Sequence, residues 1–346
     1  MGPVTEGGAD SAASVPAVLA IDAGNSKTDV AVVDADGRVW GRGRGAGYAP
    51  YQLGQDVAVE RIAALVEDVL ATAAGVGPVE HIAAYLANID LPVEEQRLRK
   101  EFEDRGWART VTVGNDTFAV LRSGTDTPRG VAVVCGAGIN CVGLLPDGRT
   151  ARFPSLGRMT GDWGGGLGLM EEVMWSSVRA EDGRGPATTL AGATADHFGL
   201  ASATAVAEAV HLGELSGERL HELVPLLFRI AEAGDAVAGE VVERQAGEIA
   251  MMAVIALRRL DLLAEETDVV LGGGVLAARP PLLMAAVERL ILGSAPRAVL
   301  RVAVDPPVVG AALLGLDRLR SDGRAPADPG GEAERLLRTR WTRTSA

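Results

Sequence analysis

The sequence predicts two similar α/β halves with mixed sheets, because one pattern of apolar runs and glycine-rich turns occurs twice. The pattern is strand, glycine-rich turn, strand, Asp-Gly turn, strand, and its copies start at Val18 and Val131, about 113 residues apart. Short apolar runs broken by Gly, Asn and Asp are typical of strands joined by tight turns. Helical periodicity between these runs adds the α layers, and the meanders make the sheets mixed rather than all parallel.

The first copy places a phosphate-type turn between two buried strands. The run Val18 to Ile21 leads into Asp22-Ala23-Gly24-Asn25-Ser26-Lys27-Thr28, and Val30 to Val33 follows. A turn of Gly and small hydroxyl residues can direct several backbone N–H groups at one point, which is what an oligophosphate needs. Asp22 ends the first strand, where it is a candidate Mg²⁺ ligand or, alternatively, a cap of the turn.

The rest of the first half alternates helices and strands. The glycine-rich segment 41–50 is predicted to be irregular, and a third extended piece before it covers 38–42. Apolar residues at three- and four-residue spacing predict a helix over 55–74. The remaining elements expected are a strand over 81–87, a helix over 94–104, a strand over 110–113 and a helix over 117–122.

The second half repeats the meander and adds more helices. The run from Val131 enters the turn Cys135-Gly136-Ala137-Gly138-Ile139-Asn140, and a glycine-dense segment follows at 157–168. Beyond it, 187–264 is predicted to be mostly helical. A strand over 268–271 then leads into Gly272-Gly273-Gly274, and the last helices are expected over 281–292 and from Pro307 to about Leu319.

These elements predict four segments of chain. They are a disordered N-terminus (1–16), a first α/β domain (17–125), a second α/β domain (126–320) and a flexible tail (321–346). The pattern leaves open whether the last helix packs within the second domain or back on the first.

Composition excludes several classes of partner. The formal net charge of −13 argues against nucleic acid or an anionic membrane as the main partner. Two cysteines, Cys135 and Cys141, give no disulfide framework and indicate a reducing, cytoplasmic location. They are expected to be core thiols, with cluster ligation by a pair in a dimer as the alternative. The oligomeric state stays open, a homodimer included.

Two common nucleotide motifs are absent from the sequence. It contains neither G-x-x-x-x-G-K-[ST] nor G-x-G-x-x-G, so Lys27 is no P-loop lysine and is equally well explained as a solvated side chain. What remains is three glycine-rich turns, each at the end of an apolar strand. One such turn is commonly structural, whereas three of them, two in duplicated settings, favour phosphate or nucleotide binding.

The motifs together resemble one family. The chain is similar to the N-acetylglucosamine kinase and BadF/BadG/BcrA/BcrD-type ATPase family of the actin, sugar kinase and Hsp70 superfamily. The resemblance covers about 17–320 and is carried by the two phosphate turns, by Gly272-Gly273-Gly274-Val275-Leu276, by Gly114-Asn115-Asp116 and by Gly161-Asp162. It implies two RNase H-like, actin-like ATPase domains with a nucleotide cleft between them.

The resemblance also assigns roles to residues. It implies an ATP- and Mg²⁺-dependent kinase of an amino sugar or related carbohydrate, with Asp116 as the catalytic base and Asp22 at the metal. ATP would contact Gly24, Asn25, Ser26, Lys27, Thr28, Gly136, Ala137, Gly138, Asn140, Gly272, Gly273 and Gly274. The sugar would contact Asp90, Asn115, Asp116, Gly161 and Asp162.

Each acidic candidate also has a structural interpretation. Asp116 directly precedes a predicted helix, so it fits an N-cap as well as a general base that accepts a proton during phosphoryl transfer. Asp162 could be a solvated loop carboxylate, and the neighbouring Trp163 either stacks on a sugar face or anchors the loop.

The chain departs from the family pattern in three places. The loop 47–51 lacks the asparagine that family sugar kinases usually have there, Trp163 follows Gly161-Asp162 in place of an acidic residue, and 86–90 keeps little beyond Asp90. These changes leave ATP binding intact and put N-acetylglucosamine itself in question. The alternative functions are an ATPase that activates a partner redox enzyme and a sugar-binding sensor without turnover.

Overall fold

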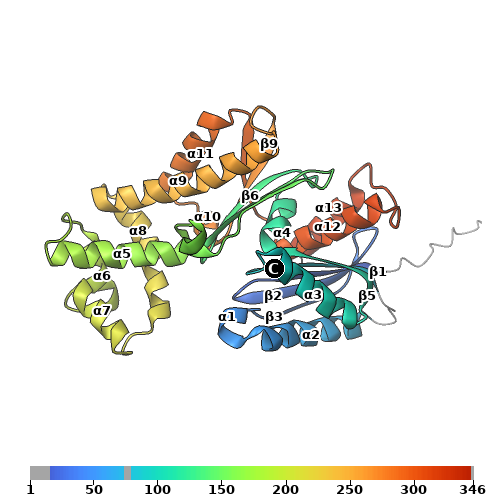
Figure 1. Cartoon of the computed structure of the whole chain (residues 1–346), viewed down its shortest axis with the longest axis horizontal. Helices are drawn as coiled ribbons and strands as arrows, with labels where there is room; N and C mark the ends of the chain where they lie inside the picture. The colour runs from blue at the N-terminus through green and yellow to red at the C-terminus, as the bar shows by residue number, and fades with distance from the viewer. Residues whose placement is uncertain (1–15, 74–78, 344–346) are drawn as a thin grey trace, which may run out of the picture. The chain divides into compact units, whose positions relative to one another are not determined.

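The computed structural model describes residues 16–73 and 79–343, and the chain divides into two units. The first unit combines residues 1–119 with 305–346, and the second comprises 120–304. In Figure 1 the first unit is coloured mainly blue and red, and the second green to orange. The predicted disorder of 1–16 falls almost wholly outside the described residues.

The first unit is built on a five-stranded mixed sheet in the order β3-β2-β1-β4-β5. Strand β1 pairs antiparallel with β2 and parallel with β4, so the meander and the crossover strands meet at β1. The β2–β3 pair is antiparallel and the β4–β5 pair is parallel. The strands are β1 (Pro16–Ala23), β2 (Lys27–Asp34), β3 (Val39–Ala46), β4 (Val79–Leu86) and β5 (Ala108–Asn115).

Helices cover both faces of this sheet, because alternate residues of its strands are apolar on each side. Leu19 and Ile21 belong to a core with α2 (Gln55–Thr72) and α3 (Pro92–Asp104). Val18 and Ala83 point to the other face, where α12 (Pro307–Ser321) packs on β1 and β4. A Cβ at Gly315 would lie 2.5 Å from Val18, so this glycine is what lets α12 approach the sheet. The first unit also contains the short helix α1 (Pro50–Leu53). Helix α4 (Asp116–Ser123) begins in the first unit and ends in the second.

The prediction that 41–50 is irregular was wrong, because β3 runs to Ala46. Its alternate glycines face α2, and a Cβ at Gly43 would lie 2.7 Å from Val69. A Cβ at Gly45 would lie 3.1 Å from Leu65. The glycines are therefore a packing requirement of the helix on the strand, which composition alone does not reveal.

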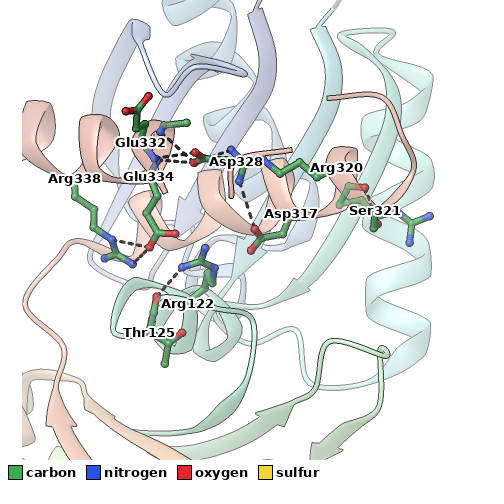
Figure 2. A network of polar contacts seen from close by, with 11 residues as sticks. Arg122, Thr125, Asp317, Arg320, Ser321, Asp328, Glu332, Glu334 and Arg338 are labelled. Atoms are coloured by element: carbon green, nitrogen blue, oxygen red, sulfur yellow. Dashed lines mark hydrogen bonds and ion pairs between the residues drawn. The ribbon is translucent and has the colours of Figure 1, made fainter. Parts of the chain in front are cut away.

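The prediction of a flexible tail after 320 was also wrong, because α13 (Glu332–Arg343) follows α12. Asp328 accepts hydrogen bonds from the backbone N–H of Glu332 (2.8 Å) and Ala333 (3.1 Å), which caps the helix. Arg338 donates to Glu334 (2.7 Å) and pairs with Asp305, as Figure 2 shows for the Glu334 contact. These contacts hold α13 in the first unit, with the side chains of Leu337 and Trp341 buried.

The second unit repeats the sheet of the first, in the order β8-β7-β6-β9-β10. Strand β6 again pairs antiparallel with the next strand of a meander and parallel with a later strand. The strands are β6 (Gly130–Cys135), β7 (Ile139–Leu144), β8 (Thr150–Arg152), β9 (Thr267–Gly272) and β10 (Ala298–Val302). This confirms the predicted fold class of two α/β halves with mixed sheets.

The second unit has more helices than the first, and the long helix α9 packs directly on β6 and β7. Ile249, Met252 and Ala256 of α9 lie in this core. The helical elements are η1 (Gly157–Thr160), α5 (Gly165–Glu181), α6 (Leu190–Phe198), α7 (Ala203–His211), η2 (Gly217–Glu222), α8 (Leu223–Glu232), α9 (Ala236–Arg259), α10 (Gly274–Ala277) and α11 (Pro281–Ser294). None of the helices in the described part of the chain is long and apolar enough to cross a membrane.

Candidate active site

The first glycine turn joins β1 to β2 and has an exposed tip. The Gly24 N–H donates to the Lys27 carbonyl (2.9 Å), which closes the turn, and Asn25, Ser26 and Lys27 are exposed. Thr28 differs from them, because it already belongs to β2 and is 1% exposed. The structure therefore presents the turn tip to solvent and places the Thr28 hydroxyl inside.

Two loops support this turn from the side. The Tyr48 N–H donates to the Gly24 carbonyl (2.9 Å), and the Asn88 amide donates to Asn25 Oδ1 (2.6 Å). A Cβ at Gly47 would lie 2.0 Å from the Asn25 carbonyl oxygen, so only glycine fits there. The loops after β3 and β4 thus fix the turn from two directions.

A row of charged side chains crosses the sheet beside the turn. Asp22, Asp29 and Arg44 are direct cross-strand partners on β1, β2 and β3. Arg44 binds Asp29 with two hydrogen bonds of 2.6 and 3.0 Å, and Lys27 lies 3.5 Å from the same carboxylate. Asp29 is thereby neutralised, and sequence analysis missed this pair because it depends on strand register.

Asp22 lacks such compensation. It is 6% exposed, and burial together with the nearby charges of Asp116 and Asp29 raises its pKa to about 8. Like charges held together in a buried place favour the protonated form. The strand ends therefore bring Asp22 and Asp116 into one electrostatic site, as their predicted roles require.

The predicted base stands at the end of β5. Burial raises the pKa of Asp116 to about 6, and hydrogen bonds with Thr117 limit the rise. The Thr117 N–H donates to Asn115 Oδ1 (2.9 Å), so the Asn115 side chain contributes the capping contact at the start of α4. Both interpretations of Asp116, as a cap and as a general base, stay predictions.

Asp90 lies beside this strand end. The Asn115 amide donates to Asp90 Oδ1 (2.9 Å), and the Asp90 N–H donates to Glu94 Oε2 (3.0 Å). The carboxyl ends of β4 and β5 thus hold Asp90, Asn115 and Asp116 side by side, although they are up to 26 residues apart in the sequence (116 − 90). The three residues of the first unit that are predicted to contact the sugar therefore lie close together.

Tyr51 is a further residue of this site that sequence analysis did not select. It lies on α1 and its side chain is 76% exposed. Partial desolvation raises the Tyr51 pKa, and the charges of Glu94 and Asp90 add to the rise. The sequence signal available was an aromatic residue at the end of the 47–51 loop, which lacks the expected asparagine.

The second glycine turn joins β6 to β7 in the second unit. The Gly136 N–H donates to the Gly138 carbonyl (2.9 Å), and the N–H groups of Gly166 and Leu167 donate to the carbonyls of Gly136 and Ala137 (2.7 and 2.9 Å). A Cβ at Gly136 or at Gly138 would meet no protein atom within 4 Å. The outer side of this turn is therefore open for a ligand to approach the backbone.

The side chain of Asn140 has partners within the protein. Its Oδ1 accepts hydrogen bonds from the Cys141 N–H (2.7 Å) and from the Ser155 hydroxyl (2.6 Å). The side chain thus links β7 to the following loop. These contacts give Asn140 a structural role, and its assignment to ATP stays a prediction.

The three glycines of the third turn are not equivalent. A Cβ at Gly272 would lie 2.5 Å from Val120, and one at Gly273 would lie 2.5 Å from the Cys135 carbonyl. Gly273 also has φ 85° and ψ 157°, a conformation that is essentially restricted to glycine. Of the three, only Gly274 has no atom within 4 Å of its Cβ position, and it is the first residue of α10. Gly272 and Gly273 therefore serve packing, whereas Gly274 can face a ligand.

The segment around Gly161 and Asp162 is also positioned by glycines. Gly161 has φ 91°, and Thr160 donates to Asp162 Oδ2 (2.6 Å). Trp163 is buried in the core of the unit under Arg244, whose guanidinium carbon is 4.0 Å from the ring centroid. Of the two predicted roles of Trp163, loop anchoring therefore fits the structure.

The two cysteines are core residues. Cys135 and Cys141 are fully buried on β6 and β7, and burial raises the pKa of Cys135 to about 12. A thiol of this kind is inert and does not reach the surface. A metal cluster shared between subunits through these side chains would require the core to open.

A magnesium ion fits the donor set at Asp22. Mg²⁺ is commonly held by one or two carboxylates together with substrate phosphates and water. The described residues include no group of three or more His, Cys, Asp and Glu arranged for a metal. Asp22 is the residue that would hold the ion, with Asp116 near it, and the ion would neutralise phosphate charge.

Comparison with known proteins follows this geometry. A model of the BadF/BadG/BcrA/BcrD ATPase family matches residues 19–315. The chain belongs to this family. It is also 24% identical over 310 residues to the N-acetyl-D-glucosamine kinase of Dictyostelium discoideum, which covers 86% of this chain and 97% of the relative.

Solved structures share the fold. A Chromobacterium violaceum protein, provisionally named an N-acetylglucosamine kinase, superposes with a TM-score of 0.63 at 21% identity over 87% of this chain and 99% of its own. A ROK family glucokinase from Streptomyces griseus, solved with glucose and AMPPNP, gives 0.52 at 19% identity over 87% and 98%. The family member described here thus has the fold of actin-like sugar kinases and is distantly related to N-acetylglucosamine kinases.

Proposed function

We propose that the protein is an ATP- and Mg²⁺-dependent kinase that phosphorylates a hydroxyl group of an amino sugar or related carbohydrate. The observation that carries this proposal is the group Asp90, Asn115 and Asp116 at adjacent strand ends, with the charge of Asp116 acting on the buried Asp22. The family and the relatives described above support the same class of reaction.

Asp116 is the general base in this proposal. Its pKa of about 6 leaves it largely ionised at neutral pH while keeping it a stronger base than an exposed aspartate. A base whose pKa lies near the working pH is the most efficient at accepting a proton in the transition state. Asp116 would accept the proton of the attacking sugar hydroxyl as the oxygen bonds to phosphorus.

The neighbouring residues would orient the sugar. Asp90 is fixed by the Asn115 amide, so its carboxylate is held in place before substrate arrives. An ionised carboxylate accepts strong hydrogen bonds from two adjacent hydroxyls. Tyr51 offers an exposed ring on which an apolar sugar face could stack, and Asp162 is proposed as a further hydroxyl acceptor.

Each unit has a glycine turn that is proposed to bind phosphate. The exposed tip at Asn25 and Ser26 and the open backbone at Gly136 and Gly138 are the groups proposed for the phosphates. Gly274 starts the short helix α10 after β9 and is proposed for the adenosine side. Lys27 is held near Asp29, which leaves its ammonium at the edge of the first turn.

The two rival functions have less support. An activator of a redox partner is expected to hold an iron–sulfur cluster between subunits, and the burial of Cys135 and Cys141 opposes this. A sensor without turnover has no need of a carboxylate with a raised pKa at the strand end, which Asp116 provides.

A screen for sugar-dependent ADP release tests the proposal. The acceptors to compare are N-acetylglucosamine, glucosamine, N-acetylmannosamine, muramic acid derivatives and glucose, each with wild type and with Asp116→Asn. We expect turnover on at least one amino sugar that the variant loses. ADP release that no sugar stimulates, or that Asp116→Asn retains, would contradict the proposal.

A further inference from the structure

A pocket of about 380 Å³ lies wholly within the second unit, beside the second and third glycine turns. Three helices supply its side chains: Leu167 from α5, Val224, Pro225 and Phe228 from α8, and Val275 from α10, with Ala278 just after α10. The volume is within the range of small-molecule sites, which is roughly 300–1,000 Å³. Its position next to Gly136 and Gly274 makes it the site for the nucleoside part of the nucleotide in the proposed function.

The side chains around this pocket are almost entirely apolar. Among the residues that line it, His221 is the one polar side chain, and the others are aliphatic, aromatic, proline or glycine. A base held by apolar walls gains affinity from buried area, which is similar for adenine and guanine. Discrimination between bases by four or five orders of magnitude requires polar groups built to match one hydrogen-bonding edge.

Three backbone carbonyls of the pocket wall accept hydrogen bonds within the protein. The carbonyls of Gly136 and Ala137 accept from the N–H groups of Gly166 and Leu167, and the Gly274 carbonyl accepts from the Ala278 N–H (3.2 Å). Pro225 has no N–H to offer. These three carbonyls therefore already accept hydrogen bonds from the protein.

His221 can serve either purine. It is exposed at the end of η2, where its ring borders the pocket. A neutral imidazole has one donor and one acceptor nitrogen, so it can accept from the adenine amino group or donate to the guanine carbonyl. Its presence therefore adds affinity without choosing between the two.

From these observations we infer that the protein accepts purine nucleotides broadly, so that GTP and ITP serve as phosphoryl donors alongside ATP. The role of these nucleotides as phosphoryl donors rests on the proposed function, whereas the binding of purine nucleotides is inferred from the pocket alone. Pyrimidine nucleotides would bind more weakly, because their smaller rings bury less apolar area in the same space.

Calorimetric binding of nucleoside diphosphates to the full chain tests this without any sugar. With Mg²⁺ present, we expect the Kd values of ADP, GDP and IDP to lie within about tenfold of one another, or 1.4 kcal/mol. CDP and UDP should bind at least about tenfold more weakly than ADP. A preference for ADP over GDP beyond tenfold, or equal binding of purines and pyrimidines, would overturn the inference.

Variants of the pocket show whether the base lies there. Ala278→Trp places an indole in the pocket and should weaken ADP and GDP binding alike. Ala277→Trp is the matched control, because Ala277 is exposed on the same turn of α10 but does not line the pocket. Unchanged binding of both nucleotides by a folded Ala278→Trp variant would also overturn the inference.

The two proposals fail separately. If purine nucleotides bind similarly but no sugar is phosphorylated with any of them, the kinase proposal is wrong and the pocket assignment stands. If a sugar is phosphorylated with ATP alone and GDP fails to bind, the pocket inference is wrong and the kinase proposal stands.

Discussion

Two glycines of the second unit should respond in opposite ways to the same substitution. In Gly138→Val the new side chain enters free space, because no protein atom lies within 4 Å of the Cβ position. In Gly273→Val the backbone needs φ 85° and ψ 157°, and the Cβ would lie 2.5 Å from the Cys135 carbonyl. The first change should therefore affect nucleotide binding and the second should affect stability.

The magnitudes follow from these surroundings. A non-glycine residue in that region of φ and ψ destabilises by about 1–3 kcal/mol, and steric overlap adds about 1–3 kcal/mol. For a unit of this size, Gly273→Val should lower Tm by on the order of 5–20 °C. Gly138→Val should change the free energy of unfolding by less than about 0.5 kcal/mol, as exposed substitutions usually do.

Among folded proteins, Gly138→Val should weaken nucleotide binding more than Gly273→Val does. If the turn at Gly138 donates two hydrogen bonds to phosphate, each contributes about 1.5–3 kcal/mol. Their loss should raise the Kd of ADP at least about hundredfold. Gly239→Val in α9 is a suitable control, because its Cβ also enters free space and it belongs to none of the three turns.

Thermal melts and ADP calorimetry on the three variants check this prediction. A Gly138→Val protein that melts like wild type and binds ADP equally well would refute the assignment of this turn to phosphate. A Gly273→Val protein with an unchanged Tm would refute the argument from backbone conformation and Cβ contact.

Three further predictions concern the first unit. Asp116→Asn should leave the ADP Kd unchanged while kcat falls by roughly two to four orders of magnitude, measured on the sugar found by screening, and near-normal turnover would leave Asp116 without a catalytic role. Tyr51→Ala should raise the KM for sugar about tenfold with little change in kcat, because the stacking ring is lost. Tyr51→Phe retains the ring and should behave like wild type. Equal KM values in wild type and both variants would exclude stacking. Burial of His81 lowers its pKa from 6.5 to about 4, so the unfolded chain binds more protons than the folded chain between these pH values. The free energy of unfolding should therefore fall by about 3 kcal/mol as the pH drops through that window. Denaturant melts of His81→Gln should lack this loss, and a pH profile identical to that of wild type would contradict the prediction.

The fold class could be predicted because its signals are local in sequence. Alternation of apolar residues, Asp-Gly turns and helical spacing each depend on a few neighbouring residues, and the repeat of the whole pattern fixed the number of halves. The second half of β3, beyond the extended piece predicted over 38–42, was missed because its glycines are required by the packing of Leu65 and Val69 of α2, about twenty residues later in the sequence. Helix α13 was not predicted because residues outside it help to fix it. Asp328 caps its start, and Asp305 pairs with Arg338 and fixes its position.

The site was predictable to a lesser degree, for a related reason. Sequence motifs identified Asp116 and Asn115, but only strand pairing shows that Asp90 lies beside them. The glycine-rich motif after β9 does not tell which glycine faces a ligand, because that depends on what a Cβ would meet at each position. Tyr51 was overlooked since its interest comes from exposure, which the sequence does not encode directly.

The contrast between two neighbouring aspartates gives a physical criterion for function. Asp29 is held by Arg44 and Lys27, so its burial is compensated and needs no further explanation. Asp22, its direct partner across the strands, is buried with a pKa raised to about 8 by desolvation and by Asp116 and Asp29. A carboxylate that opposes the folded state in this way persists in structures mainly where a ligand or reaction uses it. Neutral replacement by Asn at position 22 should therefore remove this cost and raise the free energy of unfolding, most clearly above pH 8, where Asp22 is ionised. Denaturant melts of wild type and Asp22→Asn check this, and equal stability of the two proteins above pH 8 would contradict it.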